Sequence, residues 1–195
     1  MGLSLVTDAT QEPVTLSQAK DQVLVAASIT AHDPILQNLI KRARKASERL
    51  TRRAWLTQTW RLTLQRFPAG RCIEIPRPPL ASVTSITYVD SSNVSQTLDS
   101  GDYNVRTNSS PGLVALAPTV SWPTTHTEDP EAVTVTYVAG DTTVTAVPAE
   151  AKQAILALID YWFLNRDKAD IPDFICDLLS GLHCGVKFGA YGVTA

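Results

Sequence analysis

Apolar and polar positions alternate with two different periods along this chain. From residue 33 to about residue 53, apolar residues recur every three or four positions, which is typical of one face of a helix. Between residues 57 and 138 the period shortens to two, as in half-buried strands. A helical period returns after residue 148. The order of these patterns predicts helices, then a sheet, then helices again.

Capping residues mark the beginning of the first two helices. Thr15 and Gln18 have the spacing of a capping box, which predicts a short helix over residues 15–25. Asp33 can accept hydrogen bonds from the free amides of the next helix, which we expect over residues 34–53. Both helices therefore precede the region of alternating residues.

Prolines mark two further helices near the C-terminus. Pro148 opens a helix over residues 149–166, whose apolar stripe is wider than one packing face needs. We therefore expect this helix to contact partners on two sides. Pro172 opens a last short helix that ends at Gly181.

The alternating region predicts an antiparallel sheet. Its strands are short, turn residues separate them, and no helical pattern lies between them, which argues against parallel βαβ units. The fold class is therefore α+β, with a helical core made of two N-terminal helices and a helix near the C-terminus. A mainly antiparallel β insertion over residues 57–138 joins the second and third helices. We expect this insertion to pack against the helices through Trp60, Leu62 and Leu64.

Length and composition favour one folded domain with an appendage. The chain has 195 residues, of which 44% are hydrophobic and 18% are charged, enough apolar material for a core. We expect a main domain over residues 1–169. Residues 170–195, a short helix and a tail with little core periodicity, are interpreted as a partner-binding element.

Nothing in the sequence indicates a membrane or an export signal. No apolar run approaches the ~20 residues that a membrane-spanning helix needs, so we predict no membrane partner. The N-terminus has no basic residue ahead of an apolar stretch. Three cysteines, an odd number, fit a reducing compartment. We expect synthesis in the cytoplasm.

Positive charge is concentrated in the second predicted helix. Seven of the seventeen basic residues lie there: Lys41, Arg42, Arg44, Lys45, Arg49, Arg52 and Arg53. Only Glu48 opposes them, within helical reach of Arg44 and Arg52. The basic residues centre on the side opposite to the apolar residues, so we expect one basic surface on an otherwise acidic chain.

This basic helix admits two interpretations. It can attract the phosphates of DNA, or it can dock to an acidic protein surface. Interleaved aromatic residues and a helix-turn-helix context are missing, which argues against sequence-specific recognition. Nonspecific DNA binding through residues 41–53 is therefore kept as an alternative function.

No catalytic or cofactor-binding motif is visible. The sequence has no phosphate-binding glycine loop, nucleophile elbow, zinc-protease helix or paired CxxC motif. We predict that the protein is not an enzyme and has no catalytic residue, no metal ligand and no cofactor. The four aspartates within residues 167–177 are interpreted as helix caps and solvent-facing groups.

Two chemical alternatives remain open. Cys176, His183 and Cys184 are residue types that bind zinc, although their spacing is irregular and no fourth ligand is evident. An enzyme site could also be assembled from isolated residues such as His126 and Asp129. A metal assay or a substrate screen would support the enzyme alternative.

The order of several short segments resembles the head-tail connector proteins of tailed bacteriophages, a family also found in phage-like gene-transfer particles. The resemblance spans residues 14–166, most of the chain. The segments that carry it are VTLSQAK at 14–20, DPIL at 33–36, TQTWRLTL at 57–64, FP at 67–68, IPRPPL at 75–80, VTSITYVD at 83–90, DY at 102–103, SWP at 121–123, VTVTYVAG at 133–140 and VP at 147–148.

This resemblance implies a structural role. Such proteins form rings of about twelve copies under the portal and continue the DNA channel to the tail or to a stopper protein. It implies that residues 1–169 are a connector domain. The implied partners are the portal protein, the tail or stopper protein, other copies of the chain, and DNA that passes through without sequence-specific binding. The implied location is the virion, in the neck between head and tail.

The resemblance and the residue pattern together suggest three groups of contact residues. The portal-binding group is Phe174, Leu178, Leu179, Val186, Lys187, Phe188 and Tyr191. The group that contacts DNA in the channel or a neighbouring subunit is Lys41, Arg42, Lys45, Arg49, Arg52 and Arg53. The group at the subunit interface is Trp162 and Phe163.

Overall fold

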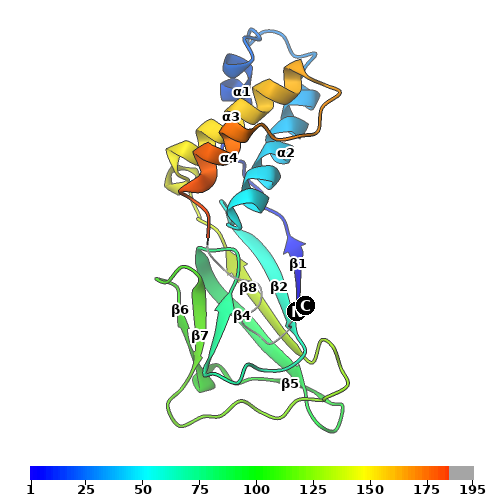
Figure 1. Ribbon diagram of the computed structural model, residues 1–195, viewed down its shortest axis with the longest axis vertical. Coiled ribbons are helices and arrows are strands. Elements are labelled where there is room, and N and C mark those ends of the chain that lie inside the picture. The colour runs from blue at the N-terminus through cyan, green and yellow to red at the C-terminus, as the bar shows by residue number, and fades with distance from the viewer. Residues whose placement is uncertain (185–195) are drawn as a thin grey trace. The chain divides into compact units, whose positions relative to one another are not determined.

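The computed structural model describes residues 1–184, which divide into two compact units. The β unit comprises Met1–Asp8, Thr57–Gly140 and Cys184, and the helical unit comprises Ala9–Leu56 and Asp141–His183. Each unit is therefore built from segments that lie far apart in the sequence. Figure 1 shows strands in one unit and helices in the other, in agreement with the predicted α+β class.

The helical unit contains four α-helices. They are α1 (Leu16–Gln22), α2 (Asp33–Thr51), α3 (Ala149–Leu164) and α4 (Asp173–Ser180). A short 3-10 turn (Val144–Ala146) precedes α3. All four helices were predicted, although α1, α2 and α3 end two or three residues earlier than expected.

The predicted capping box at α1 is confirmed, whereas the predicted cap of α2 is wrong. The Gln18 amide donates to the Thr15 hydroxyl at 3.2 Å, and the Thr15 amide donates to the Gln18 side chain at 2.8 Å. At α2 the residue before the helix is His32, whose side chain makes no capping hydrogen bond. Asp33 lies in the first turn instead, with its carboxylate 2.6 Å from the Lys20 amine. The Asp33 carboxylate, which the sequence assigns to capping, therefore forms an ion pair with Lys20.

The wide apolar stripe of α3 is buried within the helical unit itself. Helices α1, α2 and α4 all contact α3, so the expected contact on two sides is made by helices of the same chain. The fully or nearly fully buried residues of α3 are Ala151, Ala154, Ile155, Leu158, Ile159 and Trp162. They form a core with apolar residues of α2 and α4.

The β unit contains two antiparallel sheets. The five-stranded sheet has the order β1 (Gly2–Thr7), β2 (Gln58–Leu64), β8 (Val133–Ala139), β4 (Leu80–Val89) and β5 (Ser95–Thr97). The three-stranded sheet has the order β3 (Cys72–Ile75), β7 (Gly112–Leu116) and β6 (Tyr103–Arg106), and a 3-10 turn (Ser100–Asp102) precedes β6. The antiparallel prediction is confirmed, but the sheet is divided in two and the edge strand β1 was not predicted.

The β unit buries its own core. Leu62 and Leu64 are almost fully buried and pair with Val135 and Val133 of β8. The core of the helices contains neither leucine, nor the half-buried Trp60. The expected packing of β2 in the core of the helices is therefore not found among the described residues, because Leu62 and Leu64 are buried within the β unit.

One glycine permits the close approach of the two sheets. A Cβ atom at Gly112 of β7 would lie 2.5 Å from Cβ of Leu80 in β4. This distance is far below a van der Waals contact, so only glycine fits there.

None of the helices among residues 1–184 is long and apolar enough to span a membrane.

Candidate interaction surface

Helix α2 presents a row of exposed basic side chains. Lys41, Arg42, Lys45, Arg49 and Arg52 are exposed, and Arg53 is half-buried. The opposite face of α2 carries the buried residues Leu36, Leu39, Ile40 and Ala43. These six residues therefore form the basic surface that the sequence predicts.

Arg44 is the exception, and the prediction that it belongs to the basic surface is wrong. Its side chain is only 1% exposed, and its Nε atom donates to Glu12 Oε2 at 2.8 Å. Its Nη1 atom donates to Glu48 Oε2 at 3.1 Å, which confirms the predicted reach between the two residues. The remaining oxygen of Glu48 accepts the Trp55 amide at 3.1 Å. A buried charge requires such partners. Here they connect α2 to the segment before α1, which contains Glu12, and to the segment after α2, which contains Trp55.

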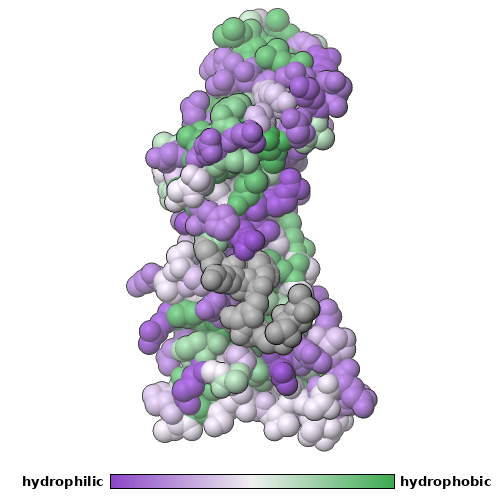
Figure 2. Space-filling model, viewed as in Figure 1, coloured by the Kyte–Doolittle hydropathy of each residue, from purple (hydrophilic) through white to green (hydrophobic). Residues whose placement is uncertain are grey.

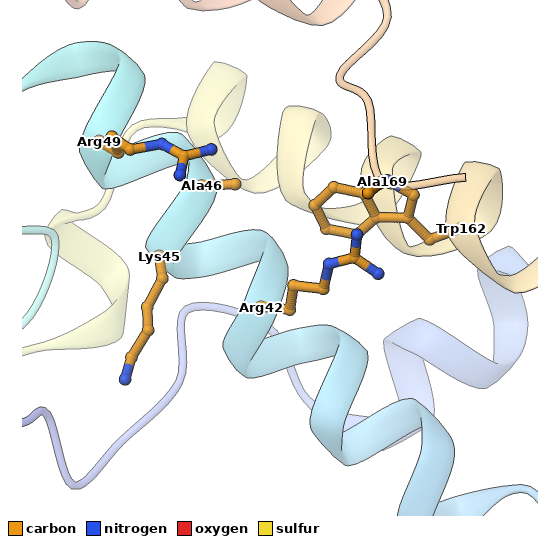
Figure 3. A pocket seen from close by; sticks show the side chains of 6 residues that line it. All are labelled: Arg42, Lys45, Ala46, Arg49, Trp162 and Ala169. Carbon is orange, nitrogen blue, oxygen red and sulfur yellow. The ribbon is translucent and has the colours of Figure 1, made fainter. Parts of the chain in front are cut away.

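Beside the exposed row lies a hollow of about 430 Å³ between α2, α3 and the segment that follows α3. We call it the basic hollow, and Figure 3 shows the residues that line it: Arg42, Lys45, Ala46, Arg49, Trp162 and Ala169. The guanidinium carbon of Arg42 lies 3.9 Å from the centre of the Trp162 ring, a cation–π contact. Three cations around an aromatic wall make a site suited to anionic groups that carry some apolar surface.

The predicted interface residues of α3 are largely used inside the helical unit. Trp162 is 3% exposed, and its indole nitrogen donates to the Asp170 carbonyl at 2.9 Å. Its accessible part lines the basic hollow, so it is not the protruding contact that the sequence suggested. Phe163 is half-buried and packs edge-on against His32, with 5.7 Å between the ring centres.

The predicted portal-binding residues differ in their exposure. Phe174 is 55% exposed, Leu178 is half-buried, and Leu179 is 2% exposed within the helical core. Leu179 is therefore not available at the surface, because it holds α4 against its neighbours. The other four predicted residues, Val186, Lys187, Phe188 and Tyr191, lie outside the described residues.

Two features of this surface were not predicted from the sequence pattern. Asp173 and Asp177 are both exposed on α4, four residues apart, and were interpreted only as caps and solvent-facing groups. The turn after α1 exposes large apolar residues: Leu24 is 92% exposed and Ile29 is 45% exposed. Figure 2 shows hydrophobic surface gathered at the end of the helical unit where α1 lies. The four-residue spacing of the two aspartates can be read from the sequence. The exposure of Leu24 cannot.

The alternative chemical sites find little support in the geometry. Cys176 is exposed and lines a hollow of about 320 Å³ with Leu50 and His183, whereas Cys184 belongs to the β unit. Within residues 1–184, no three His, Cys, Asp or Glu side chains are grouped so as to hold a metal ion. His126 and Asp129 lie in the segment between β7 and β8.

Comparison with known proteins identifies the fold. No family model and no curated protein sequence matches the chain. A chain of the native virion of a gene transfer agent (GTA) particle matches with a TM-score of 0.77 and 22% identity, over 97% of this chain and 98% of that chain. A chain from the neck of the empty GTA particle, computed with C6 symmetry, matches with a TM-score of 0.80 over 98% of this chain and 100% of that chain. This chain shares the fold of these chains. We call the shared fold the neck-protein fold.

A further chain with the neck-protein fold comes from the neck of the native GTA particle, computed with C12 symmetry. It matches with a TM-score of 0.75 and 20% identity, over 98% of this chain and 100% of that chain. The identity to the chain of the empty neck is also 20%. Both matches extend over the helical unit and the β unit, so the neck-protein fold includes both. The resemblance inferred from the sequence is confirmed at the level of the fold.

Proposed function

We propose that this protein is a structural component of the neck of a phage or phage-like particle. The observation that carries the proposal is the match to neck chains of a GTA particle over 98% of this chain and all of the matched chain. Because the match includes both units of this chain and the whole of the matched chain, it supports a shared architecture and not a single shared domain. No enzymatic activity is part of this proposal.

Within the neck, the protein acts as an adaptor ring between the portal protein and the tail or stopper protein. The matched neck chains belong to assemblies computed with sixfold and twelvefold symmetry, which supports a ring of about twelve copies. DNA passes through the ring without sequence-specific binding. Residues Val186, Lys187, Phe188 and Tyr191, in the segment after the described chain, provide the portal contact.

Deletion of the gene, followed by complementation, tests this function. We expect particles without the protein to package DNA and to lack attached tails, and the unaltered chain to restore tails. A reconstruction of the neck should then show the protein as a ring. Tailed particles in the absence of the protein, or a single copy per particle, would contradict the proposal.

Nonspecific DNA binding is a second candidate, which the exposed basic row of α2 favours. A protein that contacts phosphates through several Lys and Arg side chains loses DNA affinity steeply as salt increases. The free protein should then bind duplex DNA with a strong salt dependence. Arg49→Ala should reduce the slope of log affinity against log salt concentration. Binding that is undetectable at low salt would exclude this candidate.

A further inference from the structure

The helical unit carries both signs of charge in separate places. Its first segment, Ala9–Leu56, has an excess of basic residues, and its second segment, Asp141–His183, has an acidic excess of the same size. The net charge of the described unit is therefore zero. A unit with opposite charges on two surfaces is complementary to another copy of itself.

The acidic surface has a defined edge on α4. Ile175 and Leu179 are buried in the helical core, so the outer side of α4 carries Asp173, Phe174 and Asp177. We call these three residues the acidic edge. The two carboxylates lie four positions apart, on one side of the helix, and the neighbouring Phe174 ring is 55% exposed. An exposed aromatic ring flanked by charges is typical of a residue that anchors an interface.

The basic hollow matches this edge in chemistry and size. Its volume of about 430 Å³ accommodates an aromatic side chain. The Arg42 guanidinium covers the Trp162 ring, so its own outer face is the planar surface on which an aromatic ring from outside would stack. Arg42, Lys45 and Arg49 line the hollow and supply the positive charge that would attract the two carboxylates of the acidic edge.

We infer that the basic hollow of one copy receives the acidic edge of α4 from a neighbouring copy of the same chain. The two surfaces differ, so the contact is head-to-tail, and repetition of such a contact closes a ring. The inference rests on the proposed neck ring and names the contact that holds it together. It assigns Phe174 to the contact between copies and leaves the residues after Cys184 to the portal.

Charge reversal in particles tests the contact. Arg42→Glu with Arg49→Glu reverses the hollow, and Asp173→Lys with Asp177→Lys reverses the edge. Each double variant, supplied to particles that lack the chain, should reduce the number of copies per purified particle at least about tenfold, because like charges then face each other. Supplying both variants together should restore the copy number, since each reversed hollow finds a reversed edge in an alternating ring.

Disulfide crosslinking tests the same contact without changing the charge of the edge. Cys176 is exposed on α4 beside Asp177, and Cys72 can be replaced by serine to leave Cys176 as the exposed native thiol. With Lys45→Cys added, mild oxidation of particles should give a ladder of covalently linked copies, because the contact brings the new thiol of one copy close to Cys176 of the next, whereas a disulfide within one chain would link no copies. Gln153→Cys, at an exposed position of α3 that does not line the hollow, is the control and should give no ladder.

The outcomes separate this inference from the proposed function. Normal copy number in both charge-reversed variants, with no ladder from Lys45→Cys, would overturn the inference and leave the neck assignment intact. Absence of the unaltered chain from the neck would overturn the assignment itself. A normal copy number combined with lost salt-dependent DNA binding in Arg42→Glu, Arg49→Glu would show that the hollow serves DNA, which also overturns the inference.

Discussion

At the scale of single residues, the buried Arg44 is the position where local pattern and tertiary packing disagree most. Its 1% exposed guanidinium lies between Glu12 and Glu48, at 2.8 Å and 3.1 Å. The exposed face and the buried face of α2 both carry arginine, and on the buried face two carboxylates pair with it. A charge at this depth remains favourable only while both partners are present.

Removal of one partner should therefore destabilise the fold. We expect Glu48→Ala to lower the free energy of unfolding by about 3–5 kcal/mol, because it removes one of the two carboxylates that pair with the buried guanidinium and leaves the Trp55 amide without its acceptor. Chemical denaturation measures this change. Asn38→Ala, at an exposed position of the same helix, is the matched control and should change stability by less than about 0.5 kcal/mol. Equal stabilities of the two variants would contradict the role of the network.

The buried face of β2 gives a second residue-scale prediction. Leu62 is 0% exposed and pairs with Val135 of β8 and Leu3 of β1. Leu62→Asp places an unpaired charge in the core of the β unit and should cost several kcal/mol, at least about 3. Arg61→Asp, on the exposed side of the same strand, should cost much less. If the two variants melt at the same temperature, the orientation of β2 is wrong.

Tyr137 gives a prediction for alkaline pH. Burial raises the pKa of its hydroxyl well above the ordinary value near 10, although the positive charge of Arg77 opposes this, and the hydroxyl donates to the Pro76 carbonyl at 3.0 Å. The folded state therefore holds this proton more tightly than the unfolded state, and its contribution to stability is lost as the pH rises above about 10. Between about pH 9 and about pH 11, the melting temperature should fall more steeply than in Tyr137→Phe. Parallel profiles would contradict the burial of this hydroxyl.

At the scale of elements, α4 is part of the helical core as well as a surface. Ile175 is fully buried and Leu179 is 2% exposed, and α4 contacts both α2 and α3. The sequence assigned residues 170–195 to partner binding and not to the core. The packing of α4 changes that expectation, because burial of an aliphatic side chain contributes about 1.5–3 kcal/mol.

Two truncations separate the core role of α4 from attachment to the portal. Ending the chain after Asp167 should lower the melting temperature clearly, because it exposes the surface that Ile175 and Leu179 cover. Ending it after Cys184 should leave the melting temperature close to that of the full chain and should abolish attachment to DNA-filled heads. Differential scanning calorimetry and head-binding assays measure the two effects. Unchanged melting of the shorter chain would contradict the packing of α4.

At the scale of the whole molecule, the chain has two cores, and each is built from segments that are not consecutive in the sequence. Residues of the helical core all belong to Ala9–Leu56 and Asp141–His183, and Leu62, Ile73 and Val135 are buried in the β unit. Separate cores can open separately, each with its own free energy.

Hydrogen exchange tests the independence of the cores. Ile155→Ala leaves a cavity in the helical core and should cost about 2–5 kcal/mol. Amides of α2 and α3 should then exchange faster, while amides of β2 and β8 keep their protection. Leu62→Asp should give the reverse pattern. An equal loss of protection in both units would show that the two cores unfold as one.

The sequence by itself determined the features that depend on near neighbours in the chain. The period of apolar residues indicated α2, α3 and the antiparallel strands, and the Thr15–Gln18 pair gave the start of α1, because such signals act within a few residues. It also contained the resemblance that the fold comparison confirms.

The tertiary structure alone decided the features that depend on distant segments. Strand β1 exists because Gly2–Thr7 pairs with β2, which lies more than fifty residues later, and nothing local marks it. Arg44 is buried with Glu12, which reaches it from another segment, and the strands form two sheets instead of one. A local pattern states that a face is apolar or charged, but only the packed chain determines which surface covers it.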